Sequence, residues 1–267
     1  MISIITPTFN SSNTITKNVQ SVISQNCKEF EHIIVDNESI DDTIRKIETL
    51  YQKNNLIEKL KIISEKDSGI SDAFNKGIRA SKGDIIAILN SDDEYFDNSI
   101  FERVTKAFKY DNILIVHGDV LFIDSLYGSN RRTPRDCPVT GAILYNHPAM
   151  FIRKSVYNQL GLYKEGFRVA MDTEFFYRLQ KSFKDVRNIS SYISEIPLAI
   201  MNAGGASWNQ ELKGIQEMKN ALILHEFWNF TAKRIYFTRI FRTKVKKYLT
   251  SLSLNFIVEL WRKLKWR

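Results

Sequence analysis

Residues 85–96 read IIAILNSDDEYF, an apolar run that stops abruptly at two adjacent carboxylates, Asp92 and Asp93, followed by Glu94. An apolar run without polar alternation is typical of a strand covered on both faces. Three acids at one strand end repel each other unless a cation lies among them, which favours Mg²⁺ or Mn²⁺ bridging a diphosphate. The alternative is a helix N-terminus, where acids are favoured by the dipole, since a helical pattern begins near Asn98.

Three similar runs precede it, at residues 2–6 (ISIIT), 32–36 (HIIVD) and 60–64 (LKIIS), and the fourth strand is expected over 84–90. Apolar residues at helical spacing separate them: Ile15, Val19, Val22 and Ile23, then Ile44, Ile47 and Tyr51, then Ile70, Phe74 and Ile78, and later Ile100, Val104, Ala107 and Phe108. This alternation predicts right-handed βαβ units, and so an α/β fold with a mainly parallel central sheet and helices on both faces. Ligands bind outside the carboxyl ends of such strands.

The second half of the chain is less regular. Strands are expected over 113–124 and 149–153, and helices over 170–181 and 209–229, with a glycine pair at 204–205 before the last helix. No internal repeat or low-complexity stretch is visible.

Two further carboxylates stand at the ends of expected elements. Asp36 ends HIIVD, where it either accepts hydrogen bonds from a base N–H or a ribose hydroxyl, or forms a turn with Asn37. Asp172, in VAMDTEFFYRLQ, begins the helix expected over 170–181. It either caps that helix or is available as a general base.

The run at 60–64 leads into EKDSGISDAFNKGI, residues 65–78, in which Asp67 and Gly69 are typical turn residues before the start of a helix. Gly69 and Gly77 let the backbone approach a ligand or another element closely. Two nearby cations, Lys66 and Arg79, are either phosphate contacts or solvated surface charges.

Composition bounds the protein class. The 267 residues, 43% of them hydrophobic, suffice for one large α/β domain or for one domain with an appendage. Cys27 and Cys137 are too few for a disulfide framework or a four-ligand zinc site, and favour a reducing cytoplasm. Neither a signal peptide nor a membrane-spanning helix is expected.

The net charge of +8 is concentrated in the tail. Residues 231–267 hold eleven Lys or Arg and one acid, a net +10, so residues 1–230 carry a net −2. Apolar residues recur on one helical face: Phe237, Phe241, Val245, Tyr248, Leu252, Phe256, Leu260 and Leu264, with Trp261 and Trp266 nearby. Such a basic amphipathic helix is predicted to lie on a membrane surface. The alternatives are a helical hairpin packed on the main domain and a contact within a homodimer.

Six segments in this order resemble the large family of inverting family-2 glycosyltransferases with the GT-A fold: PTFN, VDNES, EKDSGISDAFNKGI, ILNSDDEY, HPAMFIRKS and MDTEFFYRL. They look like bacterial enzymes that build O-antigen, capsule and other surface polysaccharides, and the resemblance covers about residues 1–210. It implies a GT-A catalytic domain over 1–208, with a nucleotide-sugar-binding half at 1–97 and an acceptor half at 98–208. Residues 209–267 would then form a C-terminal helical, basic amphipathic extension.

The resemblance also implies roles for single residues. The nucleotide sugar would be bound by Thr6, Pro7, Thr8, Asp36 (to the base, commonly uracil), Asp67 and Asp92 (to the ribose or sugar). Asp93 would ligate a divalent metal, Mn²⁺ or Mg²⁺, and Asp172 would be the catalytic base. Met171 stands where the family often has Glu, which weakens this motif and leaves Glu174 as the alternative base. His147 and the Gly204–Gly205 loop would shape the diphosphate or acceptor side.

The implied reaction moves a hexosyl or N-acetylhexosaminyl group from a UDP-sugar to a hydroxyl of a lipid-linked saccharide, on a polyprenyl diphosphate, with inversion. It would take place in surface polysaccharide biosynthesis, with the protein cytoplasmic and peripheral on the cytoplasmic face of the inner membrane. The alternatives are a catalytically inactive sugar-nucleotide-binding relative and a nucleic-acid-binding protein that uses the basic tail. Nucleic acid is not the expected partner, since the body of the chain is slightly acidic.

Other nucleotide-binding folds fit less well. A Rossmann dehydrogenase has a Gly-rich turn after its first strand, whereas PTFNSSN contains no glycine. A sugar nucleotidyltransferase is expected to show a Gly-rich loop bearing Arg at the same place. The GKS or GKT of a P-loop is also missing.

Overall fold

The computed structural model describes residues 1–124, 128–137, 139–140, 143–203, 210–252 and 254. In chain order the elements are β1 (Ile2–Thr8), α1 (Ile15–Ile23), β2 (Phe30–Asp36), α2 (Thr43–Lys53), the 3₁₀ helix η1 (Ile57–Lys59), β3 (Leu60–Ser64), α3 (Ile70–Ala80), β4 (Ile85–Ile88), β5 (Glu94–Tyr95), α4 (Ile100–Ala107), β6 (Ile115–Asp124), β7 (Gly128–Arg132), β8 (Arg135–Asp136), β9 (Ile143–Leu144), η2 (His147–Ala149), β10 (Met150–Arg153), α5 (Lys154–Leu160), α6 (Met171–Phe183), η3 (Val186–Ile189), β11 (Ser190–Asn202), α8 (Glu211–Leu224) and α9 (Phe230–Ser251).

One sheet in the order β3-β2-β1-β4-β10-β6-β11-β5, with β7 paired to β6, organises the molecule. The strands β3, β2, β1 and β4 pair in parallel, as the alternation of strands and helices predicts. Beyond β4 the sheet is mixed, because β10 enters between β4 and β6 antiparallel to both. The strands β6 and β11 pair in parallel again and run in the same direction as β4, so the sheet is mainly parallel, as expected, with β10, β5 and β7 as its antiparallel strands.

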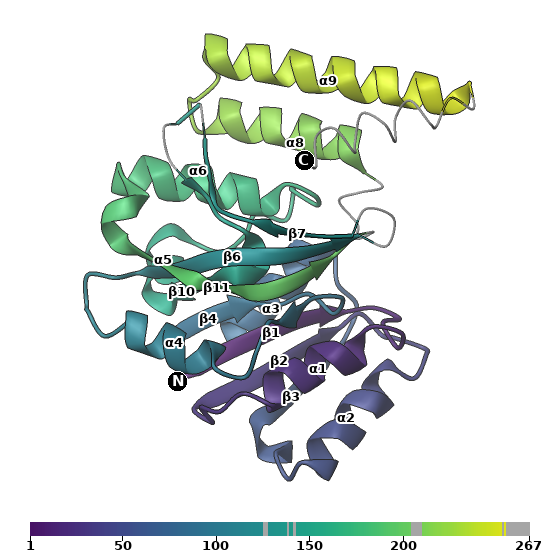
Figure 1. Ribbon diagram of the computed structural model, residues 1–267, viewed down its shortest axis with the longest axis vertical. Coiled ribbons are helices and arrows are strands. Elements are labelled where there is room, and N and C mark those ends of the chain that lie inside the picture. Colours follow the sequence, from purple (N-terminus) through teal and green to yellow (C-terminus); the bar gives the residue numbers. More distant parts are fainter. Residues whose placement is uncertain (125–127, 138, 141–142, 204–209, 253, 255–267) are drawn as a thin grey trace.

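Helices cover both faces of this sheet, which confirms the predicted α/β architecture (Figure 1). Apolar side chains of α3, α5 and α6 pack on one face, and those of α1 and α4 on the other, where α2 packs against α1. The helices α8 and α9 form a hairpin stacked on α6 as a further layer, with a small apolar cluster of its own.

Helix α3 is held close to the strand that leads into the site. A Cβ on Gly77 would lie 2.3 Å from Ile5 Cγ2 of β1, so only glycine permits this approach, as the sequence predicts. Gly69, just before α3, has φ = +132°, a conformation that side chains with a Cβ rarely adopt. The N-terminus of α3 is thereby fixed beside the carboxyl end of β1.

Several elements are absent from the sequence prediction: the short strand β5 in the first half, and α5 and the strands β7, β8, β9 and β11 in the second. The longest of them, β11, reads SSYISEIPLAIMN and pairs with β6, with register shifts on both sides of Pro197. A strand interrupted by Glu195 and Pro197 lacks the continuous apolar run on which the prediction relies. The helix expected over 209–229 ends earlier, at Leu224, where the chain turns into α9.

The basic tail begins as the expected helix, α9. One face of α9 packs on α8, as the alternative of a helical hairpin predicts for that face. The opposite face is exposed. Residues 204–205 and 255–267, which include three residues of the expected apolar face and both tail tryptophans, lie outside the described residues. In the described part of the chain, no helix is long and apolar enough to cross a membrane.

Candidate functional site

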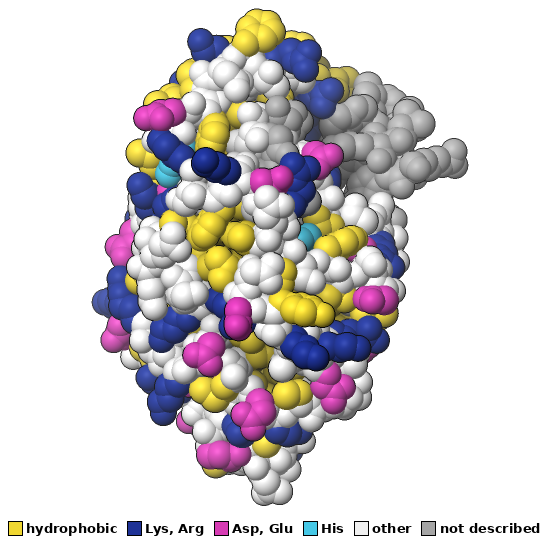
Figure 2. Space-filling model, turned by 90° about the vertical axis from the view of Figure 1, so that its left-hand side faces the viewer, with side chains coloured by type: hydrophobic (Ala, Val, Ile, Leu, Met, Phe, Trp, Pro, Cys, Tyr) yellow, Lys and Arg dark blue, Asp and Glu magenta, His cyan; other side chains and the backbone are white. Residues whose placement is uncertain are grey.

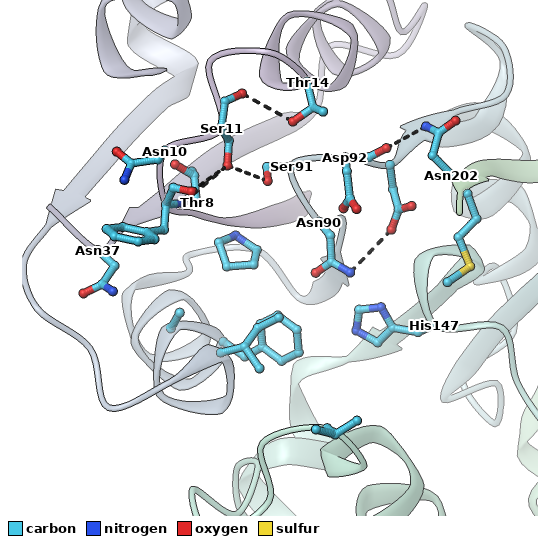
Figure 3. Close-up of a pocket in the computed structure, with 18 of the residues that line it drawn as sticks. Thr8, Asn10, Ser11, Thr14, Asn37, Asn90, Ser91, Asp92, His147 and Asn202 are labelled. Carbon is cyan, nitrogen blue, oxygen red and sulfur yellow. Dashed lines mark hydrogen bonds between the residues drawn. The ribbon is translucent and has the colours of Figure 1, made fainter. Parts of the chain in front are cut away.

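A cavity of about 750 Å³ opens at the carboxyl ends of β1 and β4, where ligands bind in open α/β sheets. This size suits a small organic ligand. Its lining residues come from the ends of β1 and β4, from the turns after β2 and β3, from η2, from the start of α6 and from the end of β11 (Figure 3). Both halves of the sheet therefore contribute to one cavity.

Most of the predicted site residues meet there. The lining residues include Pro7, Thr8, Asp67, Asp92, Asp93, His147 and Asp172. Thr6, Asp36, Lys66, Arg79, Glu94 and Glu174 are not among them. Gly204 and Gly205 lie outside the described residues.

Thr6 and Asp36 lie behind the cavity wall. Thr6 Oγ1 is 2.9 Å from His32 Nε2. The Asp36 carboxylate is buried and accepts hydrogen bonds from Thr8 Oγ1 (3.2 Å), Ser64 Oγ (2.7 Å), and both N and Oγ of Ser39 (3.0 and 2.5 Å). In this arrangement Asp36 ties together the ends of β1, β2 and β3, and its predicted contact to a base requires this network to open.

Two carboxylates follow β4. Asp93 is 3% exposed, and its Oδ2 is 3.4 Å from Asn90 Nδ2. Burial raises the pKa of the Asp93 carboxyl well above its usual value, and the Asp92 charge raises it further. Burial also raises the pKa of Asp92. No described Lys or Arg lowers either pKa, so the pair lacks a cationic partner in the described part of the chain.

This pair fits a divalent cation. The Asn90 side-chain oxygen is buried beside it without a hydrogen-bond partner, and hard oxygen donors of this kind suit Mg²⁺ or Mn²⁺. The described residues contain no group of three or more His, Cys, Asp or Glu placed to hold a metal ion. Two carboxylates are enough where substrate phosphates complete the coordination, as is usual for Mg²⁺. The third acid, Glu94, begins β5 and does not line the cavity.

The turn before α3 forms the next wall. Asp67 N donates to Asn37 Oδ1 (2.9 Å), and Asp67 Oδ1 accepts from Gly69 N (2.9 Å). Beside Gly69 lies Arg168, the one Lys or Arg that lines the cavity in the described part of the chain. The sequence analysis did not single out Arg168, and considered Lys66 and Arg79 either as phosphate contacts or as solvated surface charges; neither of these two lines the cavity. The one feature of the sequence that points to Arg168 is its position four residues before Asp172.

Asp172 lies in the first turn of α6. Its Oδ1 accepts from Thr173 N (2.6 Å), and its Oδ2 has no hydrogen-bond partner in the described part of the chain. His147 stacks on Phe74, with ring centroids 5.4 Å apart, and its Nε2 is buried without a described partner. Burial lowers the pKa of His147, and the nearby Asp172 opposes this shift. A neutral imidazole and the side chain of Asp172 thus lie near each other on the cavity wall. Figure 3 shows the place of His147 in the cavity.

Glu174, the alternative base, belongs to a different environment. It is fully buried, and its carboxylate pairs with Arg178 Nη2 (3.0 Å) and His225 Nε2 (2.9 Å). Because α6 turns Glu174 toward α8 and away from the cavity, a role as general base is not compatible with this geometry. Asp172 remains the candidate.

Comparisons with known proteins identify the family. The family model described as "Glycosyl transferase family 2" matches residues 3–180. The chain is 27% identical over 212 residues to the PGL/p-HBAD biosynthesis glycosyltransferase of Mycobacterium bovis (strain BCG / Pasteur 1173P2), which covers 78% of this chain and 79% of that protein. It is 26% identical over 206 residues to the chondroitin synthase of Escherichia coli, covering 71% of this chain and 28% of the synthase.

Solved structures agree on the fold. The chain is similar to S. aureus TarS 1–349 in complex with UDP-GlcNAc (TM-score 0.65, 18% identity, 84% of this chain and 65% of that one). It spans 39% of the longer TarS chain. It is also similar to a mannosyltransferase from Pyrobaculum calidifontis in complex with GDP-Man and Mn²⁺ (TM-score 0.64, 12% identity, 97% and 80% covered). The predicted GT-A fold is therefore confirmed.

The family match runs through about two thirds of the chain and includes Asp67, Asp92, Asp93 and Asp172, which meet in the cavity. This chain accordingly belongs to glycosyl transferase family 2.

Proposed function

We propose that this glycosyltransferase moves a hexosyl or N-acetylhexosaminyl group from a UDP-sugar to a hydroxyl of a polyprenyl-diphosphate-linked saccharide, with inversion, in surface polysaccharide biosynthesis. The observation that carries the proposal is the meeting of Asp92, Asp93 and Asp172 in one cavity at the carboxyl edge of the sheet. The similar structure of S. aureus TarS 1–349 is a complex with UDP-GlcNAc, which supports the donor class.

The donor would occupy the side built by the first half of the chain. Thr8 and Asp67 line the cavity beside the ends of β1 and β3, where a uridine can be bound by polar side chains. Thr6 and Asp36 would support this wall from behind. Arg168 would face the diphosphate, because it is the one cationic side chain on the described lining.

Asp93 would ligate the divalent metal, Mn²⁺ or Mg²⁺, and Asp92 beside it would contact the ribose or the sugar and add negative charge at the metal. When bound, the cation supplies positive charge that neutralises the departing nucleoside diphosphate. The Asp93 carboxyl has one described side-chain partner, the distant Asn90 amide. Burial disfavours its ionised form, as the raised pKa indicates, and a neighbouring cation would stabilise that form.

Asp172 would take the proton of the acceptor hydroxyl as that oxygen attacks the anomeric carbon opposite the leaving diphosphate. One displacement from the opposite face inverts the anomeric configuration. The Asp172 Oδ2 is available for this proton. The neutral His147 ring would orient the reacting sugars through its unpartnered Nε2.

The relatives' names support a glycolipid or polysaccharide product, since one acts in PGL/p-HBAD biosynthesis and another is a chondroitin synthase. A lipid-linked acceptor is presented at a membrane. A peripheral position on the cytoplasmic face of the inner membrane would bring the cavity to it.

Helix α9 would provide that attachment. Its outward face exposes the apolar residues Phe230, Phe237, Phe241, Val245, Tyr248 and Leu252. Seven Lys or Arg and no acid lie within the same helix. Figure 2 shows apolar and basic side chains next to one another at this end of the molecule, at the top of the view. Exposed aromatic residues flanked by cations suit an anionic bilayer, where each basic residue contributes about 1 kcal/mol.

A thermal shift experiment tests the donor and metal proposal. UDP at about 100 times its Kd should stabilise the protein by about 2.7 kcal/mol, hence by several degrees in Tm, when Mn²⁺ is present. EDTA should abolish the shift. An equal shift in EDTA would contradict the metal role, and the absence of a shift with UDP would contradict the donor class.

Vesicle co-sedimentation tests the attachment. The full chain should pellet with anionic vesicles at low salt and be released at 1 M salt, where screening is strong. The double variant F241S/Y248S should stay in the supernatant. Ile223→Ser, at an exposed apolar position of α8, is the matched control and should pellet like the wild type. If the wild type stays in solution as a dimer that F241S/Y248S dissociates, this face is instead a homodimer contact.

A further inference from the structure

A carboxylate from the C-terminal hairpin reaches the wall of the cavity. Glu217 lies on α8, beyond the residues matched by the family model, and is 7% exposed. Its Oε2 accepts hydrogen bonds from three consecutive backbone N–H groups, those of Arg168 (3.0 Å), Val169 (2.7 Å) and Ala170 (2.9 Å). One oxygen therefore fixes the chain just before α6.

Three successive N–H groups that converge on one point form an anion-binding concavity, here filled by the protein's own carboxylate. Ala170 is the N-cap of α6 and has no side-chain oxygen to serve its N-terminal N–H groups. Glu217 takes part of that role from another helix, and a negative charge is favoured at a helix N-terminus. Hydrogen bonds to an ionised acceptor are about twice as strong as neutral ones, which offsets the burial of the charge.

Two more contacts hold α8 against the same segment. A Cβ on Gly214 would lie 3.0 Å from Val169 Cγ1, so the backbone of α8 approaches Val169 closely. At the far end of α8, His225 Nε2 lies 2.9 Å from Glu174 Oε1 of α6. The start of α6 is thus fixed to α8 on both sides of the turn that carries Asp172.

The segment held by Glu217 carries site residues. Arg168, Val169, Met171 and Asp172 all line the cavity. The donor wall built by β1 and β4 receives no contact from Glu217, whose described hydrogen bonds all go to residues 168–170. A change at Glu217 should therefore move Asp172 and the diphosphate contact of Arg168, and leave the part of the nucleotide side built by β1, β3 and β4 in place.

We propose that Glu217 is a positioning residue for the transfer reaction: through residues 168–170 it sets the place of the Asp172 carboxylate and of Arg168. This inference rests on the proposed function, in which Asp172 is the base. Misplacing a reacting group by about 1 Å can cost about 10²-fold in rate. Glu217→Ala should lower kcat by about 10- to 100-fold and raise the Kd of UDP with Mn²⁺ by much less, about two- to fivefold, through the shifted Arg168. Glu217→Gln keeps an acceptor oxygen at the same place and should restore kcat to within about threefold of the wild type.

The experiment combines turnover with hydrogen exchange on the full chain. Turnover is the release of UDP from a panel of UDP-hexoses and UDP-N-acetylhexosamines with octyl glycosides as acceptors. Glu211→Ala is the control, since Glu211 is also on α8 but contacts Thr243 and Lys246 of α9. It should keep wild-type kcat. Exchange of the amides of residues 168–170 should be fast in Glu217→Ala and slow in Glu217→Gln and in the control.

The outcomes separate this inference from the proposed function. A wild type that releases no UDP counts against the proposed function, and the exchange data then decide the Glu217 contact alone. The inference is overturned if residues 168–170 stay protected in Glu217→Ala. It is also overturned if the Kd of UDP rises in parallel with the loss of kcat, because a general loss of structure would do the same.

Discussion

The two halves of the sheet hold their cavity groups in different ways. In the first half, Asp36 accepts hydrogen bonds from Thr8 and Ser64, which end the neighbouring strands β1 and β3. In the second half, Glu217 of α8 holds the segment before Asp172, and lies 47 residues further along the chain than Ala170, one of the residues that it binds. The donor side is tied by strand register, and the acceptor side by the docking of helices.

The difference has a physical consequence. In parallel strands, residues that end each strand meet at one edge without further help, as the register pairs Thr8 with Asp36 and Asp36 with Ser64. A helix start has no such register, so α6 depends on side chains from α8 to fix it. We therefore expect that the acceptor side can be weakened while the donor side keeps its binding.

Asp93→Ala should produce the largest effect, because it removes a donor-side group on which both binding and transfer depend. Mn²⁺-dependent binding of UDP and transfer should both be lost, and the fold should persist, since a buried carboxyl with a raised pKa contributes little to stability. Calorimetry with UDP and circular dichroism give the two measurements. Glu94→Ala, next in sequence but off the cavity, should bind normally. Wild-type affinity for UDP with Mn²⁺ in Asp93→Ala would refute the assignment.

Asp172→Asn should separate the two sides. Binding of UDP should stay at the wild-type level, and the transfer rate should fall by about 10²–10⁴, the usual contribution of a general base. Glu174→Gln is the contrasting variant: it disrupts a buried ion pair and should lower stability by about 3 kcal/mol, with transfer retained below the Tm. If Asp172→Asn keeps more than about a tenth of the wild-type rate, Asp172 is not the base.

Asp36→Asn tests whether the donor side is tied as described. The amide cannot accept every hydrogen bond that the carboxylate accepts, so the free energy of unfolding should fall by about 1–3 kcal/mol in urea titrations. Asp67→Asn, on the cavity side, should change stability by less than about 0.5 kcal/mol and should weaken binding of UDP. If Asp36→Asn weakens binding of UDP with no loss of stability, Asp36 contacts the base directly and the network is incidental.

The first half of the fold was predictable because its information is local. Each strand from β1 to β4 is a continuous apolar run ending in polar residues, and each helix between them shows an apolar face. The site residues Asp67, Asp92 and Asp93 follow from the same rule, since polar residues after buried strands gather at one edge. The rule does not distinguish a side chain in the cavity from one behind it: Thr6 and Asp36, which the family resemblance assigns to the nucleotide, lie behind the cavity wall.

The second half was less predictable because its contacts are long-range. The strand β11 pairs with β6, 75 to 79 residues earlier, through a segment broken by Pro197. The place of Glu217 depends on the docking of α8 on α6, which no spacing in the sequence encodes. From the helical pattern of 209–229 alone, Glu217 would be predicted to be solvent-exposed, because the pattern does not show that the N–H groups of residues 168–170 lie beside it.

The smallest expected effect compares one buried histidine in each half. Burial lowers the pKa of His32 to about 3 and that of His117 to about 4, against 6.5 when unfolded. Below pH 6.5 the unfolded chain binds these protons and the folded chain does not. The free energy of unfolding therefore decreases by about 1.4 kcal/mol for each histidine with each unit by which the pH is lowered. His32→Gln and His117→Gln should each remove the contribution of one histidine to the pH dependence of the free energy of unfolding, measured by urea unfolding between pH 6 and pH 5. The raised pKa of Asp93 acts in the opposite direction and cancels when wild type and variant are compared at the same pH. Parallel stability curves for wild type and His32→Gln would mean that the donor half opens enough to protonate His32, and that its strand-end network is looser than the hydrogen bonds of Asp36 imply.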